Sequence, residues 1–335
     1  MIWDVFNNSA FKLRSLTESI NKIPPVFSYL GQVDGLFSED GVATTTVAVE
    51  EQEGMLILVN NSKRGTNGQT MPLRPRKVRA FQVSHKQIND QVLADEVLNI
   101  RMFGSETQLN TVASLVADKL ETAAMSMEQT LEYMRLGAVK GKVLDADGSV
   151  ITDLFAEFEQ APREQTWKIS NEMSNDGAIK RKCSELIRST LKILGGTPIR
   201  SFELLCGDEI FDAIETSREL RDANRWRNNA EFLVDRSAFR YFEYAGFRFT
   251  NYQGYMGDRN FLDPKEAYLL PIGVPGMFKV TYAPADYVEV AGTTGIKYYA
   301  KQERLPMDKG IQIECQTNPL VLCTRPAALC KITLG

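Results

Sequence analysis

The sequence contains a single histidine, His85, among its 335 residues. One imidazole removes most histidine-based catalytic triads and every metal site that needs several histidines. Phosphate-binding loops are missing as well: no Gly-x-Gly-x-x-Gly follows a predicted strand, and Arg64-Gly65-x-x-Gly68 lacks the Gly-Lys-Ser/Thr ending such a loop requires. The sequence therefore gives little support to an enzyme or a nucleotide-binding protein, and we expect no cofactor.

Long apolar runs and a strong charge of either sign are also absent. No window holds about 18 apolar residues in succession, and residues 1–19 lack the basic start and apolar centre of a signal peptide. The net charge is −4 and the pI is near 5.4, whereas a dedicated nucleic-acid binder is usually basic. We therefore expect no association with a membrane.

Cysteine is scarce and its pattern does not suggest a metal site. The five cysteines are odd in number, widely spaced and set among apolar residues, a pattern that indicates free, buried thiols in a reducing compartment. Cys315, Cys323 and Cys330 are spaced unlike zinc ligands. Residues 145–148 predict a turn rather than a calcium loop, so we expect no metal.

The longest helical pattern covers residues 105–137, where apolar residues recur about every 3.6 positions. These residues are Leu109, Val112, Val116, Leu120, Ala123, Met127, Leu131 and Met134. Ser105 with Gln108 predicts the start of the helix, and Arg135 with Gly137 predicts its exit. At about 1.5 Å per residue such a helix is about 47 Å long, comparable with a domain diameter. It fits a core helix of a large domain, and the rest of the chain must define its role.

Residues 42–59 and 78–83 predict a long hairpin with a polar tip at residues 60–69. A strand of about 15 to 18 residues reaches roughly 50 to 60 Å. A compact chain of 335 residues has a radius of gyration of only about 20 Å. The ribbon would therefore overhang its own domain. Because an isolated two-stranded ribbon is marginal in water, we expect it to lie on a neighbouring copy.

Charge along this hairpin supports the same interpretation. Between Gly54 and Asn89 there is no acidic residue, and basic residues gather there, while an acidic cluster precedes them on the outgoing strand. This separation indicates charge complementarity between subunits, although a solvated positive face on an ordinary surface hairpin stays open as the alternative. The candidate intersubunit contacts are Lys63, Arg64, Gly65, Arg74, Arg76, Arg79, Glu50, Glu51 and Glu53.

The remaining patterns alternate helices and strands. We expect helices at residues 11–20, 88–102, 177–194, 208–216 and 218–232, a hairpin at 142–151, and strands at 202–206, 239–252, 267–271, 310–316, 320–323 and 329–334. This order predicts an α+β protein with one lobe, at about 176–285, inserted between parts of the other.

The order of several short strings resembles the major capsid proteins of lambda-type tailed bacteriophages, the major capsid protein E family. Each string is weak alone, but their order spans nearly the whole chain. They include Ile20-Asn21-Lys22-Ile23-Pro24, Arg64-Gly65, Phe81 with His85, Lys140-Gly141-Lys142, Tyr244-Ala245-Gly246, Asn260-Phe261-Leu262, Leu270-Pro271-Ile272-Gly273, Gln316-Thr317-Asn318-Pro319-Leu320 and Arg325-Pro326-Ala327.

The resemblance implies the tailed-phage major capsid fold. It implies an N-terminal arm (1–41), an extended loop (42–87), a peripheral domain (88–175) with a spine helix (105–137), an axial domain (176–285) and a return to the peripheral domain (286–335). It further implies hexamers and pentamers that form an icosahedral shell around double-stranded DNA in the virion, assembled in the host cytoplasm. Because the similarity starts near residue 17, we expect a separate scaffolding protein, besides a portal and a decoration protein as partners.

Two other functions remain as alternatives. A nucleic-acid-binding module could use the basic hairpin at 54–89, and its binding would weaken steeply with salt. An enzyme with an unrecognised carboxylate site is supported by nothing specific. We expect a structural protein without an active site, which encloses DNA without sequence-specific binding.

Overall fold

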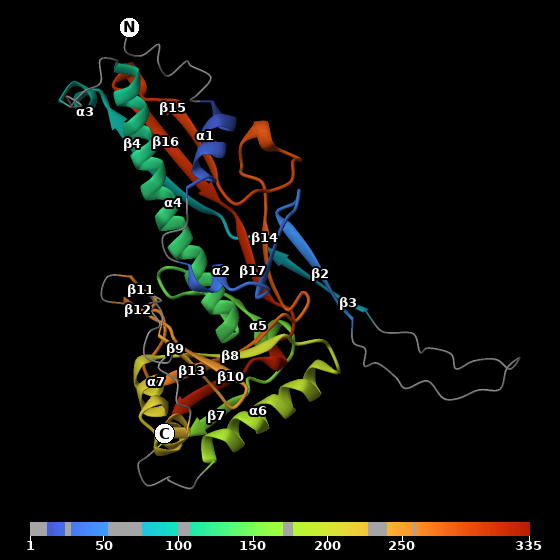
Figure 1. Cartoon of the computed structure of the whole chain (residues 1–335). Helices are drawn as coiled ribbons and strands as arrows, with labels where there is room; N and C mark the ends of the chain where they lie inside the picture. Colours follow the sequence, from blue (N-terminus) through green and yellow to red (C-terminus); the bar gives the residue numbers. More distant parts are fainter. Residues whose placement is uncertain are drawn as a thin grey trace, which may run out of the picture.

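The longest element is the helix α4, which spans Gln108–Lys140 (Figure 1). The structure, a computed structural model, describes residues 12–23, 28–52, 76–99, 108–169, 177–226, 240–256 and 259–335. The predicted apolar stripe of α4 is buried at Val116, Leu120, Met127, Leu131 and Met134, which confirms its helical period. The predicted start at residue 105 lies outside the described residues.

The predicted exit of this helix is three residues early. Gly141, at φ 84°, has the left-handed conformation that ends the helix after Lys140. Gly137 lies inside the helix, where a Cβ would stand 2.8 Å from the carbonyl oxygen of Lys142. The glycine at 137 therefore permits close contact between the helix and the next strand.

An antiparallel sheet covers the N-terminal half of α4. Its order is β15-β16-β4, formed by Tyr299–Arg304, Gly310–Thr317 and Lys86–Leu93. Helix α1, Leu13–Ile20, packs against both the sheet and α4 through Leu16 and Ile20. The predicted helix at 88–102 is wrong at its start, because residues 88–93 belong to β4 and the helix α3 spans Ala94–Asn99.

A second group of elements surrounds the C-terminal half of α4. Its sheet has the order β1-β14-β17, with β1 parallel and β17 antiparallel to β14. The hairpin β5-β6 confirms the predicted turn between its strands. The bounds in this group are α2 Tyr29–Gln32, β1 Phe37–Gly41, β5 Lys142–Leu144, β6 Val150–Asp153, α5 Leu154–Glu157, β14 Phe278–Tyr282, β17 Pro319–Cys323 and η6 Pro326–Ala328. Outside this group, η4 Val288–Val290 follows β14, and η5 Pro306–Asp308 connects β15 to β16.

A six-stranded sheet forms the lower part of the molecule in Figure 1, in the order β7-β18-β13-β8-β10-β9. Helices α6 and α7 pack on the same face of this sheet around one buried cluster. The bounds are β7 Glu164–Trp167, α6 Ala178–Leu194, β8 Ser201–Cys206, α7 Asp208–Glu215, α8 Arg218–Trp226, β9 Tyr241–Tyr244, β10 Phe247–Asn251, β11 Tyr255–Met256, β12 Arg259–Asn260, β13 Glu266–Ile272 and β18 Lys331–Leu334.

These elements confirm the α+β class and most of the predicted helices and strands. The six-stranded sheet takes β7 and β18 from either side of the expected axial range, 176–285. The domain limits therefore stay a prediction. All five cysteines are free and buried, which confirms their predicted burial.

Candidate intersubunit surface

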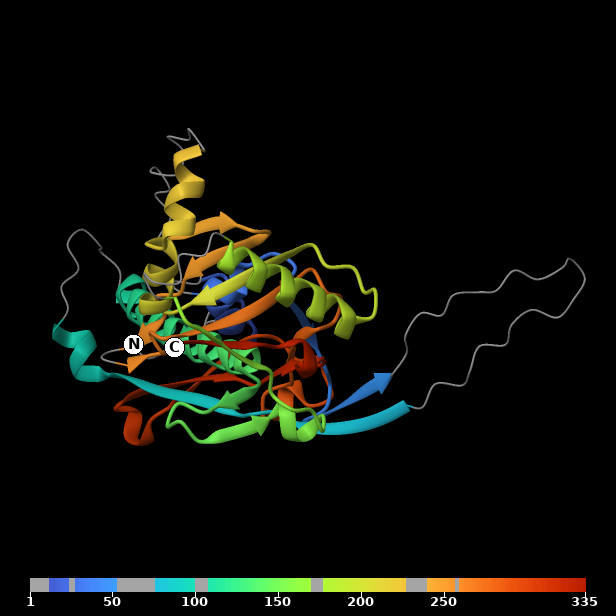
Figure 2. The same cartoon turned by 90° about the horizontal axis from the view of Figure 1, so that it is seen from below.

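The predicted long hairpin begins as a two-stranded ribbon, formed by β2 (Thr46–Gln52) and β3 (Arg76–Gln82). The two strands pair antiparallel from Thr46 opposite Gln82 to Gln52 opposite Arg76. Figure 2 shows both strands leading away from the body of the molecule. Residues 53–75, which include the predicted tip, lie outside the described residues. The described part of the ribbon leads away from the body, and its full length and its contact with a neighbouring copy stay predictions.

The root of the ribbon is anchored in the core. Phe81 is buried and its ring stacks on that of Phe158, with centroids 6.0 Å apart. Val47 and Val49 pack against the same cluster from the opposite strand. Val78, which lies on β3 nearer the tip of the ribbon than Phe81, leaves 62% of its surface exposed. The ribbon is thus fixed where it leaves the body and offers apolar surface beyond that point.

Charged side chains clamp β3 to the turn after α5. The Lys77 ammonium lies 3.2 Å from a carboxylate oxygen of Glu159, and the Arg79 guanidinium lies 4.0 Å from the other. Arg79 also lies over the Phe158 ring, 5.2 Å from its centroid. The hydrogen bond from Lys77 and the nearby cations lower the pKa of Glu159. Arg79, a candidate intersubunit contact, thus has described partners within its own subunit.

The other candidate residues are placed only in part. The backbone register puts Glu51 opposite Lys77, Glu50 opposite Val78 and Arg76 opposite Gln52. Lys63, Arg64, Gly65, Arg74 and Glu53 lie outside the described residues. Their roles between subunits therefore remain predictions.

A buried ionic cluster holds the N-terminal arm against α4. Arg135, 1% exposed, donates to Ser28 Oγ (2.8 Å), Glu128 (3.0 Å) and Glu39 on β1 (2.6 Å). A carboxylate oxygen of Glu132 lies 3.7 Å from the same guanidinium. Because β1 leads directly into the ribbon, this cluster fixes the path by which the chain reaches β2.

The two glutamates that the cluster takes from α4, Glu128 and Glu132, connect further segments. Glu132 accepts hydrogen bonds from the Leu30 amide (2.8 Å) and the Tyr252 hydroxyl (3.3 Å). Burial raises the pKa of Glu132. Glu128 accepts from the Lys297 ammonium (2.7 Å) and from Tyr298. Burial alone would raise the pKa of Glu128, but Lys297 and Arg135 outweigh it and lower that pKa to about 2.

The sequence interpretation missed this cluster and assigned Arg135 to the helix exit. A signal was nevertheless present, because Glu128, Glu132 and Arg135 are spaced by four and three residues and so share one face of the helix. That face coincides with the apolar side, where Leu131 and Met134 are buried. Charges of both signs on an apolar face indicate a buried ionic network.

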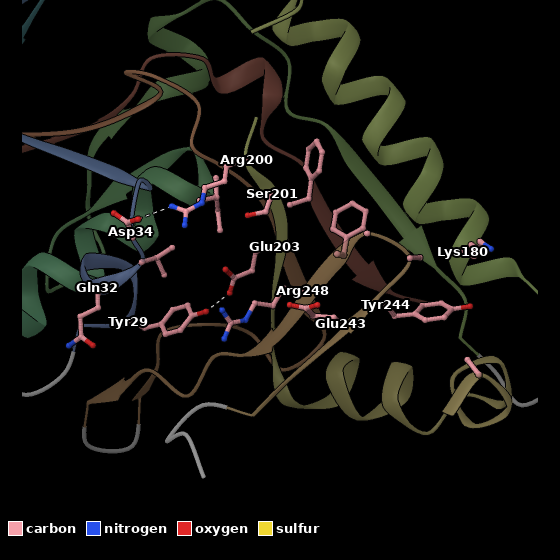
Figure 3. Close-up of a pocket in the computed structure, with 17 residues that line it drawn as sticks. Tyr29, Gln32, Asp34, Lys180, Arg200, Ser201, Glu203, Glu243, Tyr244 and Arg248 are labelled. Carbon is pink, nitrogen blue, oxygen red and sulfur yellow. Dashed lines mark hydrogen bonds and ion pairs between the residues drawn. The ribbon is translucent and has the colours of Figure 1, made fainter. Parts of the chain in front are cut away.

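A groove of about 980 Å³ separates α2 from the outer strands of the six-stranded sheet. Figure 3 shows Tyr29 and Glu203 pointing toward each other across it, joined by a hydrogen bond. Thr250 also donates to Glu203, at 2.6 Å, and Arg200 pairs with Asp34 at 2.7 Å. These hydrogen bonds and this ion pair connect residues 29–34 to the six-stranded sheet.

Among the described residues, no three histidine, cysteine, aspartate or glutamate side chains are grouped as they would be around a metal ion. In the same part of the chain, no helix combines the length and the apolar composition that crossing a membrane requires.

Comparison with known sequences decides the family. The family described as "Phage major capsid protein E" matches residues 12–334. The chain belongs to this family of phage capsid proteins. The major capsid protein of Salmonella phage Felix O1 is 24% identical to it, over 97% of this chain and 96% of that protein. The major capsid protein of Pseudomonas phage KPP10 is 25% identical, over 96% of each.

Solved structures agree on the fold of this capsid protein. The putative capsid protein of a prophage of E. coli CFT073 superposes with a TM-score of 0.53 at 16% identity, covering 78% of this chain and 80% of that one. The mature capsid of bacteriophage PhiM1 also gives 0.53, at 10% identity, covering 93% and 90%. The predicted resemblance and capsid fold are therefore confirmed.

The family assigns the chain a structural role in the phage virion, as a subunit that forms the capsid shell. The alternative of a nucleic-acid-binding module finds no support in these comparisons. Two basic residues of that hairpin, Lys77 and Arg79, are engaged with Glu159 of their own subunit.

Proposed function

We propose that this capsid protein assembles as hexamers and pentamers into an icosahedral shell that encloses phage double-stranded DNA. The ribbon of residues 42–87 lies over the adjacent subunit. The observation that carries this proposal is the direction of β2 and β3, which leave the body from an anchored root. Repeated contacts of this kind are heterologous, and such contacts close into rings when the rotation between subunits allows it.

The contacts beneath the ribbon combine apolar and charged groups. Exposed ion pairs contribute only about 0 to 1 kcal/mol each, so apolar contacts and the number of copies supply most of the stability. Lys63 and Arg64 at the tip form salt bridges with acidic groups of a neighbour, with Glu50, Glu51 and Glu53 as the candidate partners. Gly65 at the tip and Arg74, Arg76 and Arg79 on the returning strand are the further candidate contacts. The ribbon thus joins subunits through charge at its rim and apolar surface at its centre.

Further features rest on the resemblance to the family alone. They are the domain limits given above, the absence of catalytic activity, assembly in the host cytoplasm, and the partners: a separate scaffolding protein, a portal and a decoration protein. Negative-stain microscopy of the expressed protein, with and without a co-expressed scaffolding protein, tests the first partner. Equal yields of closed shells in both preparations would count against it.

Deletion of residues 60–69 tests the role of the ribbon. The deleted subunit should fold, because the three buried clusters of the described residues are built from other segments of the chain, but it should form few shells. Replacing the same residues by ten glycines and serines preserves the length and separates the loss of reach from the loss of charge. Normal shells from the deleted subunit would contradict the proposal.

A further inference from the structure

Helix α6 carries a strongly basic outer face. Along its exposed side there are five cations and one acidic residue, Glu185. The cations are Lys180, Arg181, Lys182, Arg188 and Lys192, and we call them the basic face. Arg181, Arg188 and Lys192 are spaced by seven and four residues, so they form one stripe along the helix. Among the described residues neither Arg188 nor Lys192 has an ion-pair partner.

Apolar side chains accompany these cations. Leu191 and Ile193 flank Lys192, and they leave 43% and 42% of their surface exposed. Single exposed apolar residues are common on proteins, but two beside a row of cations resemble an interface, where apolar groups lie within a charged rim. A helix face that is exposed only to water would be expected to carry charged residues without these two apolar side chains.

Helix α7 carries the opposite charge. Its acidic face consists of Asp208, Glu209, Asp212 and Glu215, all on the side of the helix away from the buried Ile210, Phe211 and Ile214. Arg240 neutralises part of this face, because it lies 2.7 Å from Glu215 and 3.9 Å from Asp212. Lys265 lies 3.9 Å from Glu209. Four carboxylates against two cations leave the face negative.

A hollow lined by both polar and apolar residues lies next to the acidic face. It has a volume of about 220 Å³ and is lined by Gly207, Asp208 and Tyr255, among others. Tyr255 leaves 63% of its surface exposed. The acidic face thus has apolar surface beside it, as the basic face does.

The two faces point to different sides of the molecule. Both helices cover the same face of the six-stranded sheet, yet α7 and the C-terminal end of α6 lie at opposite ends of it in Figure 1 and Figure 2. The C-terminal part of the basic face, with Arg188 and Lys192, therefore cannot meet the acidic face within one chain. The two faces can meet between copies related by a rotation, in a head-to-tail ring.

We propose that the basic face of α6 docks against the acidic face of α7 of the next subunit in the ring. This contact rests on the proposed function, because it requires subunits arranged in rings. A nucleic-acid backbone is the competing occupant of a basic helix, but Glu185, Leu191 and Ile193 interrupt the positive surface, and phosphates would leave the acidic face of α7 without a partner.

Charge reversal in the full chain tests the contact. Arg188→Glu with Lys192→Glu makes the basic face acidic, and Glu209→Lys with Asp212→Lys makes the acidic face basic. Each pair alone should reduce the yield of rings and shells by about tenfold or more, because like charges at an interface are strongly repulsive. The four substitutions together keep the net charge and should restore assembly, as counted by electron microscopy and sedimentation.

Mixing the two paired variants gives a sharper result. Each variant repels itself, but the acidic α6 of one fits the basic α7 of the other, so the variants must alternate around a ring. Alternation closes only in rings with an even number of subunits. The mixture should therefore form hexamers and no pentamers, and it should build tubes or sheets in place of closed shells.

The controls separate this contact from other causes. Arg188→Lys with Lys192→Arg keeps the charges and should assemble as the wild type does. Normal assembly of either reversed pair, pentamers in the mixture, or a quadruple variant with native circular dichroism that fails to assemble would each overturn the docking. Intact shells that bind less DNA after reversal of α6 would assign that face to nucleic acid. A wild-type protein that forms no rings would instead overturn the proposed function.

Discussion

Arg135 is the residue at which α4 is joined to β1 and to the segment that precedes α2. Its guanidinium contacts Glu128, Glu132 and Glu39 inside the protein. A buried ion pair contributes little net stability by itself, because desolvation offsets the attraction. Removing one partner is a different matter, since the remaining charges stay buried without compensation.

Replacing Arg135 by methionine should therefore lower the free energy of unfolding by about 3 to 5 kcal/mol. Urea denaturation of the unassembled subunit measures this change. Arg14, whose side chain is 92% exposed and pairs with Glu18 on one turn of α1, is the matched control, and Arg14→Met should change the value by about 0.5 kcal/mol or less. A loss at Arg135 no larger than that of the control would contradict the role of the cluster.

Glu128 makes the folded subunit sensitive to acid. Its pKa is lowered from 4.5 to about 2 in the folded state, so the folded state binds fewer protons than the unfolded state between these values. Stability is present above about pH 4.5 and is lost as the pH falls toward about 2. Glu128→Gln should flatten the pH dependence in this window, measured by urea denaturation at several pH values.

Glu132 provides the contrast for that measurement. Burial raises its pKa, so the folded state binds more protons than the unfolded state and this group lowers stability as the pH rises above its ordinary value. Glu132→Gln should change the pH dependence on the neutral side. Identical pH profiles for both variants would show that the two glutamates do not titrate as their surroundings require.

At the scale of elements, periodicity predicted the helices that bury one face. The apolar residues of α4 and α6 recur at helical spacing, and both helices form where the pattern places them. The predicted helix at 88–102 is wrong over residues 88–93, which belong to β4. The eight-residue pairing of this strand with β16 outweighs the local pattern. Pairing between distant segments is not visible in local spacing.

The same limit applies to the candidate site. The sequence predicted a ribbon and its charges, but Glu159, which clamps Lys77, lies 82 residues further along the chain. Arg135 is a charge within the apolar stripe of a helix, yet its partner Glu39 lies on strand β1, 96 residues earlier in the chain. Contacts of this kind depend on the tertiary arrangement. The sequence therefore indicated the ribbon and its charges, but not the residues of the same subunit that hold it in place.

Substitution of Gly141 tests whether the close contact with Phe155 stabilises the C-terminal end of α4. Its φ of 84° disfavours any side chain, and a Cβ there would stand 2.1 Å from the Phe155 ring. Gly292, at φ 77°, has no atom within 4 Å of that position. Gly292→Ala should cost about 1 to 2 kcal/mol from backbone strain, and Gly141→Ala should cost clearly more because Phe155 must move. Equal melting temperatures for the two variants would show that the contact with Phe155 is unimportant.

At the scale of the whole molecule, two regions offer exposed surface for contacts with other subunits. The ribbon leaves the central part from a root held by Phe81 and Glu159, and the six-stranded sheet presents α6 and α7 at its ends. Neither surface is needed to close a buried cluster of the subunit. A subunit can therefore lose an outward contact and stay folded, which separates stability from assembly.

The clamp at Lys77 allows that separation to be measured. Because Lys77 and Glu159 are both exposed, Lys77→Glu should leave the melting temperature of the subunit unchanged. It should slow shell formation severalfold, followed by light scattering, because a ribbon released at its root samples directions that miss the neighbour. Lys77→Glu with Glu159→Lys restores the pair and should restore the rate, whereas Lys22→Glu, at an exposed position on another segment, should have no effect. If the swapped pair assembles as slowly as Lys77→Glu, the ribbon is aimed by its apolar root alone, and Phe81 becomes the residue that sets its direction.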